Sequence, residues 1–277
     1  MKRLLITGGS GDLGRPLSEL AVAAGYEVWV TYLQRPERIK AGQPIRLDLN
    51  DKNAVQAALD RLQPDVIIHT AVQQDGADQR EQIVNAAVHL CQLSSPAARR
   101  ILLSSDMVFD GQKAPYRDDD PPSPLSVYGQ AKAETETMGD CVVRTSLIYD
   151  FERGNRQVDW LLETIARSER CRLFRDEFRS PIWAVNLGEA LLELADSAIR
   201  GLLNIAGPRR MSRLELGQGL LQTLGYQPGE HIESVSQAGT GRPPDLTLDV
   251  SRAQTLLRTP LLSFEEARAR WVRQRTR

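Results

Sequence analysis

Cysteine is scarce in this sequence, and long apolar runs are missing. The chain has 277 residues, and its three cysteines, Cys91, Cys141 and Cys171, lack the spacing of metal ligands. So few cysteines argue against a disulfide framework or a cysteine-based metal site, and they are typical of a reducing, cytoplasmic compartment. For the same reason we expect no metal ion. No apolar run reaches the roughly 18 residues of a membrane-spanning helix, so we also expect no membrane partner.

The sequence also lacks an excess of charge of either sign. Its 35 Lys and Arg residues face 36 Asp and Glu residues, which leaves a net charge of -1 at pH 7. Proteins that bind nucleic acids usually carry a clear basic excess, so we expect no nucleic-acid partner. The hydrophobic fraction of 41% is sufficient for a large core, in one domain or in a main domain with a smaller companion.

Short apolar runs alternate with amphipathic segments in the first half of the chain. This alternation is typical of an α/β fold, in which helices cover both faces of a parallel sheet. Right-handed crossovers then predict a doubly wound, Rossmann-type arrangement. The predicted strands cover residues 3–7, 27–32, 45–49, 65–69, 100–104, 142–148 and 202–206. The predicted helices cover residues 14–25, 53–62, 79–93 and, as a charged amphipathic segment, 263–277.

The pattern changes after Arg144, and irregular, arginine-rich segments interrupt the alternation from residue 151. We expect residues 1–150 and about 184–206 to form the dinucleotide-binding domain. Residues of about 151–183 and 207–277 are expected to form a smaller, discontinuous C-terminal substrate domain over the carboxyl edge of the sheet.

A glycine-rich turn joins the first predicted strand to the first predicted helix. Glycine at such positions allows a tight turn, a close approach of the backbone to a pyrophosphate, and close packing of the helix on the sheet. The helix N-terminus then offers free N–H groups and the positive end of its dipole. The residues expected to bind the cofactor here are Gly8, Ser10, Gly11, Asp12, Leu13 and Gly14.

The end of the second strand indicates which dinucleotide is bound. A carboxylate there would bind the ribose hydroxyls of NAD, whereas here the strand is followed by Arg35 and then Arg38. Because a guanidinium fork suits a 2′-phosphate, NADP(H) is preferred and NAD(H) is possible; solvated surface arginines are the alternative explanation. Asp48 and Leu49 are expected near the adenine, although Asp48 also suits a turn.

Ser104 and Ser105 follow the fifth strand, and Tyr128 and Lys132 lie on a later helix. A spacing of four places tyrosine and lysine on one helical face. Tyrosine loses its proton near pH 10, and a neighbouring ammonium group is expected to lower that pKa. Ser105 would bind a substrate carbonyl, and Tyr128 would donate the proton while the cofactor delivers hydride. Ser105, Tyr128 and Lys132 are therefore the candidate catalytic residues.

These motifs together resemble an extended short-chain dehydrogenase/reductase. Within that group, LSSDMVFDG, PYRDDDPPSPLSVYGQAK, RTSLIY, FRSPIW and GRPPDLTLD are similar to the dTDP-4-dehydrorhamnose reductase family. The resemblance implies NADPH-dependent reduction of a 4-keto nucleotide sugar, as in dTDP-rhamnose biosynthesis. It also implies cofactor contacts from Thr70, Ala71, Asn85, Ser104, Tyr128, Lys132 and Thr145.

The chain departs from that family at two positions near the catalytic residues. Ser105 stands where the family commonly has threonine, which keeps the hydroxyl, and Met107 stands where tyrosine is common, which removes a possible substrate contact. A substrate diphosphate needs cations outside the cofactor fold, and arginine suits it; surface solvation is the alternative. The candidate substrate residues are Met107, Arg153, Arg179 and Arg242, with Arg156 as a further cation.

Two other functions remain open. Sugar-nucleotide epimerases and dehydratases share the fold and the Tyr/Lys pair, but they usually have an acid after the second strand, and a dehydratase needs a second acid where Met107 follows Asp106. The motifs are also similar to the regulatory subunit of methionine adenosyltransferase, a non-catalytic NADP-binding protein. In that case Trp271 of the terminal helix could dock a partner, although packing on its own domain is the simpler expectation. A homodimer is also possible.

Overall fold

The computed structural model describes residues 1–72 and 76–276, and seven strands of this part of the chain form one parallel sheet. The strand order is β11-β6-β5-β4-β1-β2-β3. The chain builds the sheet outward from β1 to β3 on one side and then from β4 onward on the other, so the topological switch point lies between β1 and β4. The strands are β1 (Arg3–Thr7), β2 (Glu27–Tyr32), β3 (Gln43–Arg46), β4 (Val66–His69), β5 (Arg99–Ser105), β6 (Cys141–Thr145) and β11 (Gly201–Asn204).

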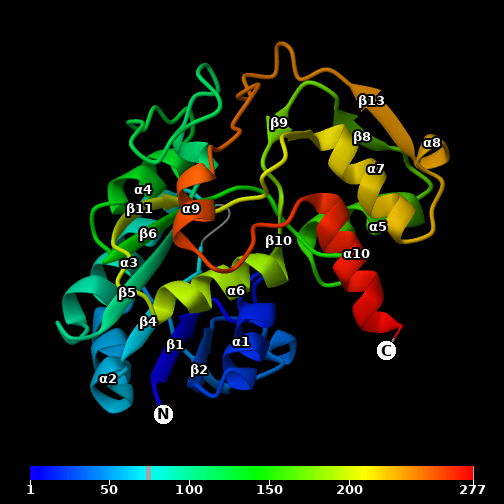
Figure 1. The fold of residues 1–277 in the computed structure, drawn as a ribbon. Coiled ribbons are helices and arrows are strands. Elements are labelled where there is room, and N and C mark those ends of the chain that lie inside the picture. The colour runs from blue at the N-terminus through cyan, green and yellow to red at the C-terminus, as the bar shows by residue number, and fades with distance from the viewer. Residues whose placement is uncertain (73–75, 277) are drawn as a thin grey trace.

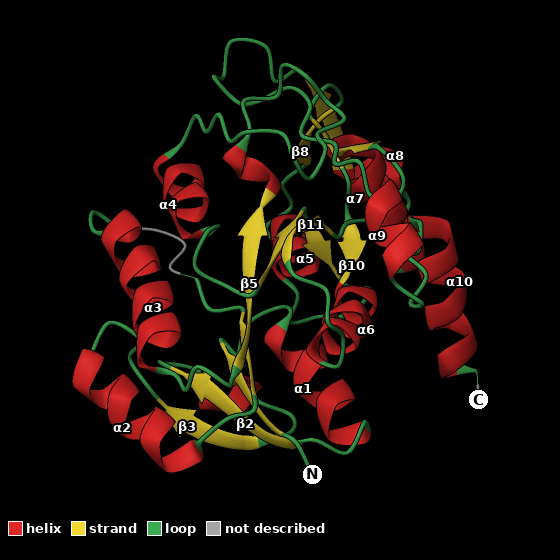
Figure 2. Ribbon diagram, turned by 60° about the vertical axis from the view of Figure 1, so that its left-hand side comes forward, coloured by secondary structure: helices red, strands yellow, loops and turns green. Residues whose placement is uncertain are grey.

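Helices cover both faces of this sheet, as the sequence predicts. Figure 2 shows α2, α3 and α4 on one side of the sheet and α1 and α6 on the other. Their bounds are α1 (Gly14–Ala23), α2 (Lys52–Leu62), α3 (Gln79–Leu93), α4 (Val127–Thr135) and α6 (Ala184–Ala195). The predicted doubly wound fold is confirmed.

The continuous apolar run of β1 is explained by burial on both faces. Leu4, Leu5 and Ile6 are each 0% exposed. Leu4 and Ile6 belong to the core on the side of α1 and α6, whereas Leu5 belongs to the core on the side of α2. Successive strand residues point to opposite faces, so a strand covered on both sides needs apolar residues throughout.

Some element ends differ from the prediction. β3 begins and ends earlier than residues 45–49, and β6 ends at Thr145 where the sequence predicts a strand as far as residue 148. The chain leaves the sheet there, and β7 (Ile148–Tyr149) pairs instead with β10 (Ile182–Trp183). A strand predicted as one run is therefore two short strands in different sheets.

A second, smaller core lies beyond the carboxyl edge of the sheet, toward the upper right of Figure 1. It is surrounded by α5 (Arg156–Ala166), β8 (Cys171–Phe174), β9 (Phe178–Arg179), β12 (Met211–Ser212), α7 (Arg213–Thr223), α8 (Pro228–His231), β13 (Ile232–Val235) and α10 (Phe264–Arg275). β8 pairs with β13 and β9 pairs with β12. In the described part of the chain, every helix is too short or too polar to span a bilayer.

The C-terminal third of the chain contributes to both cores. Leu246, Leu248 and Leu261 pack in the large core with the sheet, and α9 (Ser251–Leu256) contacts β11. Phe264 and Ala267 of α10 return to the smaller core. The two-domain division remains a proposal, and the segment around α9 belongs structurally with the larger unit rather than with residues 207–277 as a whole.

Candidate active site

The turn between β1 and α1 is so tight that Gly8 and Gly14 leave no room for a side chain. Gly8 has φ +74°, and a Cβ there would lie 2.7 Å from the Cα of Ala71. A Cβ on Gly14 would lie 2.2 Å from the carbonyl oxygen of Gly8. Leu13 stands at the N-cap of α1 and has no polar side chain to cap the first N–H groups. The residues present therefore fit a bound pyrophosphate.

The end of β4 lies directly beside this turn. Thr70 donates through its hydroxyl to the carbonyl of Thr7 at 2.6 Å, and the N–H of Ala71 donates to Thr7 Oγ1 at 3.3 Å. Asn85 lies partly buried on α3. Thr70 and Ala71 therefore lie beside the glycine turn, as predicted from the sequence. Their contacts with a cofactor, and the contact of Asn85, remain predictions.

The two arginines beyond β2 differ in their surroundings. Arg35 is exposed, whereas Arg38, in the short helical turn η1 (Pro36–Arg38), lies 3.4 Å from Asp12 and also donates to the carbonyl of Gly154. Of the two, Arg35 is the more available to a 2′-phosphate. Asp48 is exposed, and its carboxylate accepts a hydrogen bond from the N–H of Asn50 at 2.9 Å. This is the turn-forming role that was the alternative to a contact with the adenine.

Helix α4 places the tyrosine and lysine near each other. Ser126 caps it by accepting from the N–H of Gly129 at 3.1 Å. A Cβ on Gly129 would lie 2.2 Å from the carbonyl oxygen of Met107, so α4 packs tightly against η2 (Asp106–Val108). Lys132 Nζ lies 6.0 Å from the centroid of the Tyr128 ring and donates to the carbonyl of Leu103 at 2.9 Å.

Burial dominates the acid–base properties of this pair. It lowers the pKa of Lys132 to about 8. Burial also raises the pKa of Tyr128, as does the charge of Asp106, against the hydrogen bond with Ser105 and the charges of Arg156 and Arg179. The expectation that the protein lowers the pKa of Tyr128 is therefore wrong, because desolvation outweighs the neighbouring cations. The protein holds Tyr128 protonated, which is the form that a proton donor needs.

The two serines after β5 face different surroundings. Ser105 accepts from the N–H of Met107 and donates to Asp106, both at 3.2 Å, beside Tyr128. Ser104 donates to the buried carboxylate of Glu136 at 2.7 Å. Successive strand residues point to opposite faces, so the Ser104 hydroxyl points away from Ser105 and is already paired, and a contact of Ser104 with the cofactor remains a prediction.

Thr145 lies opposite Ser105 in the register of β5 and β6. Its hydroxyl is buried and has no hydrogen-bond partner among residues 1–72 and 76–276. A buried unpaired hydroxyl is costly, and a ligand can satisfy it. This orphan group at the carboxyl edge of the sheet fits a cofactor or substrate bound across β5 and β6.

The candidate substrate residues are not equivalent. Arg179 is buried and donates from Nε to Asp106 at 2.7 Å, whereas Arg242 forms a two-pronged contact with Glu177, at 2.6 and 3.0 Å. Met107 is partly buried next to Ser105, and Arg153 is exposed. The structure therefore brings Arg179 and Met107 to the catalytic residues and leaves Arg153 at the surface.

Sequence reasoning missed Arg213, Glu177 and the ion-pair role of Asp106. Arg213 begins α7, directly after the N-cap Ser212, whose hydroxyl and the Glu215 carboxylate form a capping box. That Ser-x-x-Glu pattern is readable in the sequence and would have located the helix start. Nothing local indicates that this start lies near Arg179, because the two residues are far apart in the chain.

Other polar and aromatic residues have packing roles. His69 is buried, and its Nδ1 lies 2.7 Å from the Thr7 hydroxyl. Burial, and secondly the charge of Lys132, lowers the pKa of His69 to about 3, so it is neutral near pH 7. Trp183 is buried and donates to Asp150 at 3.0 Å, and Trp271 packs on Phe151 within its own unit. Within the described residues, no group of His, Cys, Asp and Glu is arranged to hold a metal ion.

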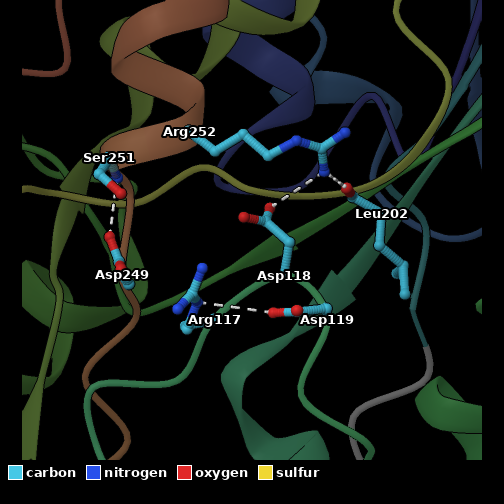
Figure 3. A pocket seen from close by; sticks show the side chains of 7 residues that line it. All are labelled: Arg117, Asp118, Asp119, Leu202, Asp249, Ser251 and Arg252. Carbon is cyan, nitrogen blue, oxygen red and sulfur yellow. Dashed lines mark hydrogen bonds and ion pairs between the residues drawn. The ribbon is translucent and has the colours of Figure 1, made fainter.

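A cavity of about 470 Å³ lies at the edge strand β11 and is lined by none of the candidate catalytic residues. Figure 3 shows its charged side chains, which pair with one another: Arg117 lies 3.6 Å from Asp119, and Arg252 lies 3.9 Å from Asp118. Charges that are already paired leave little to attract a charged ligand, so this cavity is not the candidate active site.

Comparisons with known proteins fit this geometry. The family model described as RmlD substrate binding domain matches residues 1–277. A dTDP-4-dehydrorhamnose reductase of Aggregatibacter actinomycetemcomitans is 32% identical over 218 residues, which cover 73% of this chain and 70% of that protein. Methionine adenosyltransferase 2 subunit beta of Danio rerio is 27% identical over 286 residues, 92% of this chain and 85% of that protein.

Solved structures share the fold over nearly the whole chain. A hypothetical dTDP-4-dehydrorhamnose reductase from Sulfolobus tokodaii is 29% identical with a TM-score of 0.81, over 95% of this chain and 98% of that one. A dTDP-4-dehydrorhamnose reductase from Bacillus anthracis, in complex with NADP, is 22% identical with a TM-score of 0.79, over 99% of each chain.

Proposed function

The chain belongs to the RmlD substrate-binding domain family, and we propose that it is an NADP(H)-dependent reductase of a keto group on a nucleotide-activated sugar. One observation carries this proposal. Ser105, a protonated Tyr128 and the buried Lys132 lie together at the carboxyl edge of the sheet, beyond the glycine turn. This is the arrangement that donates a proton to a carbonyl oxygen beside a bound dinucleotide.

Each residue has a distinct part in the proposed step. The reduced nicotinamide, when bound, supplies the hydride that the carbonyl carbon receives. The Ser105 hydroxyl holds the carbonyl oxygen within reach of Tyr128, which gives that oxygen its phenolic proton. Lys132 lies 6.0 Å from the tyrosine ring and stabilises the negative charge that remains on the phenolate.

NADP(H) is the proposed cofactor, with NAD(H) as a weaker ligand. The exposed Arg35 follows β2, where a carboxylate would select NAD. Gly8, Gly11 and Gly14 with the N-terminus of α1 would hold the pyrophosphate. The Thr145 hydroxyl would find at the nicotinamide end the partner that it lacks among the described residues. The NADP complex of the relative from Bacillus anthracis supports this choice.

A nucleotide-activated sugar is the proposed substrate class. The relatives from Aggregatibacter actinomycetemcomitans and Sulfolobus tokodaii carry the name dTDP-4-dehydrorhamnose reductase, which supports a dTDP-linked 4-keto sugar. The cluster of arginines near Asp106 supports a negatively charged substrate.

A partner-binding role is the second candidate, because subunit beta of methionine adenosyltransferase 2 aligns with 92% of this chain. Turnover distinguishes the two roles. We expect the protein to oxidise NADPH only when a 4-keto dTDP sugar is present, and the variant Tyr128→Phe to lose at least about 100-fold of that rate while it binds NADPH as the native chain does. Tight NADPH binding with no oxidation by any keto sugar would favour the partner-binding role.

A further inference from the structure

Asp106 directly follows Ser105, and its carboxylate is completely buried. The guanidinium group of Arg179 donates to both carboxylate oxygens, from Nε to Oδ2 at 2.7 Å and from Nη2 to Oδ1. The Ser146 hydroxyl donates to Oδ2 at 2.5 Å, and the Ser105 hydroxyl donates to Oδ1 at 3.2 Å. One carboxylate therefore receives hydrogen bonds from the ends of β5 and β6 and from the short strand β9.

The two serine hydroxyls are held with unequal strength. A hydroxyl that donates to a charged carboxylate usually lies about 2.5–2.7 Å away, and Ser146 is at that distance. The 3.2 Å contact of Ser105 is longer than the roughly 2.5–3.0 Å of an ordinary O–H···O hydrogen bond. Because Arg179 offsets the charge of Asp106, this carboxylate attracts the Ser105 proton only weakly.

A serine hydroxyl has a single proton to donate, and this limits what Ser105 can bind. Its oxygen accepts from the N–H of Met107 at 3.2 Å, and its proton points to Asp106. To bind the carbonyl oxygen of a substrate, Ser105 has to turn this proton away from Asp106. A buried carboxylate without a neighbouring cation would retain the proton, because a hydrogen bond to an ionised acceptor is about twice as strong as a neutral one.

Arg179 is fixed between two buried carboxylates. Its side chain is 7% exposed, and its third nitrogen, Nη1, lies 3.7 Å from Glu177. Glu177 also receives the two-pronged contact from Arg242. A cation that is already paired with acids attracts a further anion only weakly. The position of Arg179 therefore suits an effect on Asp106 better than a contact with a substrate anion.

We propose that Arg179 is a positioning residue, which neutralises Asp106 and so releases the Ser105 hydroxyl to donate to the carbonyl oxygen of the substrate. This inference rests on the proposed function, because a keto group is the acceptor that Ser105 would bind. It assigns Arg179 an action through Asp106 and Ser105, in place of the direct substrate contact that the sequence suggests.

The kinetic test compares the removal of the cation with the removal of the acid. We expect Arg179→Met to lower kcat for keto reduction about 100-fold, as the loss of one donor to a reacting oxygen does. Asp106→Asn, and the double variant Asp106→Asn with Arg179→Met, are each expected to be at least about 10-fold faster than Arg179→Met alone, since a neutral amide holds the Ser105 proton less strongly. An ion pair with a purely structural role predicts equal losses from removing either partner.

A second measurement detects the hydrogen bond itself. Protein loaded with NADP+ binds a 4-keto dTDP sugar without reducing it, because the oxidised cofactor has no hydride to give. Infrared spectroscopy of a sugar labelled with carbon-13 at the keto carbon then reports the carbonyl stretch, which a donated hydrogen bond lowers. We expect a shift to lower frequency in the native protein, a smaller shift in Arg179→Met, and a recovered shift in the double variant.

Arg100→Met is the matched control, because it removes a guanidinium group that contacts Asp140 at 2.9 Å near the start of β5, the strand that ends at Ser105. We expect native kcat and a native carbonyl band from this variant. An unchanged NADPH affinity shows that each variant is folded. If Arg179→Met does not fold, the double variant decides: kcat within about 10-fold of native supports the positioning role, and a larger loss overturns it.

The outcomes separate this inference from the proposed function. Equal kcat values in Arg179→Met and Asp106→Asn would overturn the positioning role, as would the same carbonyl frequency in Arg179→Met and the native protein. In both cases the native chain still reduces the sugar, so the proposed reductase stands. Failure of the native chain to oxidise NADPH with any keto sugar would overturn the proposed reductase, and this inference with it.

Discussion

Lys132 has an unusual electrostatic environment among the candidate catalytic residues. Its ammonium group is buried, with the Leu103 carbonyl as its hydrogen-bond acceptor. Burial favours the neutral amine and moves the pKa from the ordinary 10.5 to about 8. Lysine is charged below its pKa, so the charge that stabilises the Tyr128 phenolate is present at neutral pH and is lost as the pH rises.

This shift predicts a pH dependence for keto-sugar reduction. We expect kcat/KM to be constant near neutral pH and to fall as the pH rises through about 8, where Lys132 loses its proton. The measurement is NADPH oxidation across that range with a saturating cofactor. Lys132→Met is expected to be slower by about 100-fold or more and to lose the inflection. An inflection that persists in Lys132→Met would show that another group titrates.

Glu136 and Arg144 form a buried ion pair beneath the same helix. Their side chains are 4% and 1% exposed, and Ser104 adds a third hydrogen bond to the Glu136 carboxylate. Removing one partner leaves a buried charge, so Glu136→Ala is expected to lower the free energy of unfolding by about 3–5 kcal/mol. Chemical denaturation measures this loss.

The matched control for that variant is Glu134→Ala, two residues earlier, whose ion pair with Arg80 is exposed on both sides. Exposed pairs contribute about 0–1 kcal/mol, so little change is expected. Equal losses in the two variants would contradict the structural role given to the buried pair.

That Ser105, Tyr128 and Lys132 lie close together could be predicted from the sequence because their geometry is local; their catalytic role remains a proposal. A spacing of four fixes Tyr128 and Lys132 on one helical face, and Ser105 ends an obvious apolar strand. The place of Arg213 could not be predicted, because its backbone reaches Glu177 only through the pairing of β9 with β12. The direction of the Tyr128 pKa shift could not be predicted from the sequence, because burial is its largest cause and burial depends on the whole fold.

At the scale of the element, the contact between α4 and η2 sets the distance from Tyr128 to Ser105. Gly129 allows this contact, because any Cβ there would lie 2.2 Å from the carbonyl oxygen of Met107. A backbone atom cannot move aside as a side-chain end can. The helix would therefore have to shift as a unit and carry Tyr128 with it.

Gly129→Ala is accordingly expected to cost about 1–3 kcal/mol of stability, as overpacking does, and to lower kcat for keto reduction. Denaturation and steady-state kinetics measure the two effects. Gly229→Ala is the control, because a Cβ at that position has no atom within 4 Å. A Gly129→Ala protein with native stability and native kcat would refute the importance of this contact.

Elements with a long, regular pattern were predictable, and short ones were not. The bounds of β1, β2 and α3 agree with the sequence pattern, because β1 is one continuous apolar run and the pattern of β2 and α3 is unbroken over their whole length. β7, β9, β10 and β12 have two residues each, too few to show any period. Since these short strands form the walls around Arg179 and Trp183, the substrate side of the site was the part that the sequence left open.

At the scale of the whole molecule, the chain crosses several times between the two cores. β7 and α5 lead out to the smaller core, α6 returns to the sheet, and α7 leads out again before α9 comes back. The cluster around Asp106 and Arg179 therefore joins residues from both units. This arrangement would bring the proposed cofactor-binding and substrate-binding groups into one site. The sequence alone does not reveal which of the last segments pack in the larger core and which in the smaller core.

The most direct test of the reductase is transfer of deuterium from cofactor to sugar. NADPH that carries deuterium at both C4 positions of the nicotinamide is mixed with a 4-keto dTDP sugar, and the product is examined by mass spectrometry. Direct hydride transfer predicts one deuterium bound to carbon in the alcohol formed, with no transfer in Tyr128→Phe. An alcohol that contains no deuterium, or an unchanged keto sugar beside tightly bound NADPH, would contradict the proposed function.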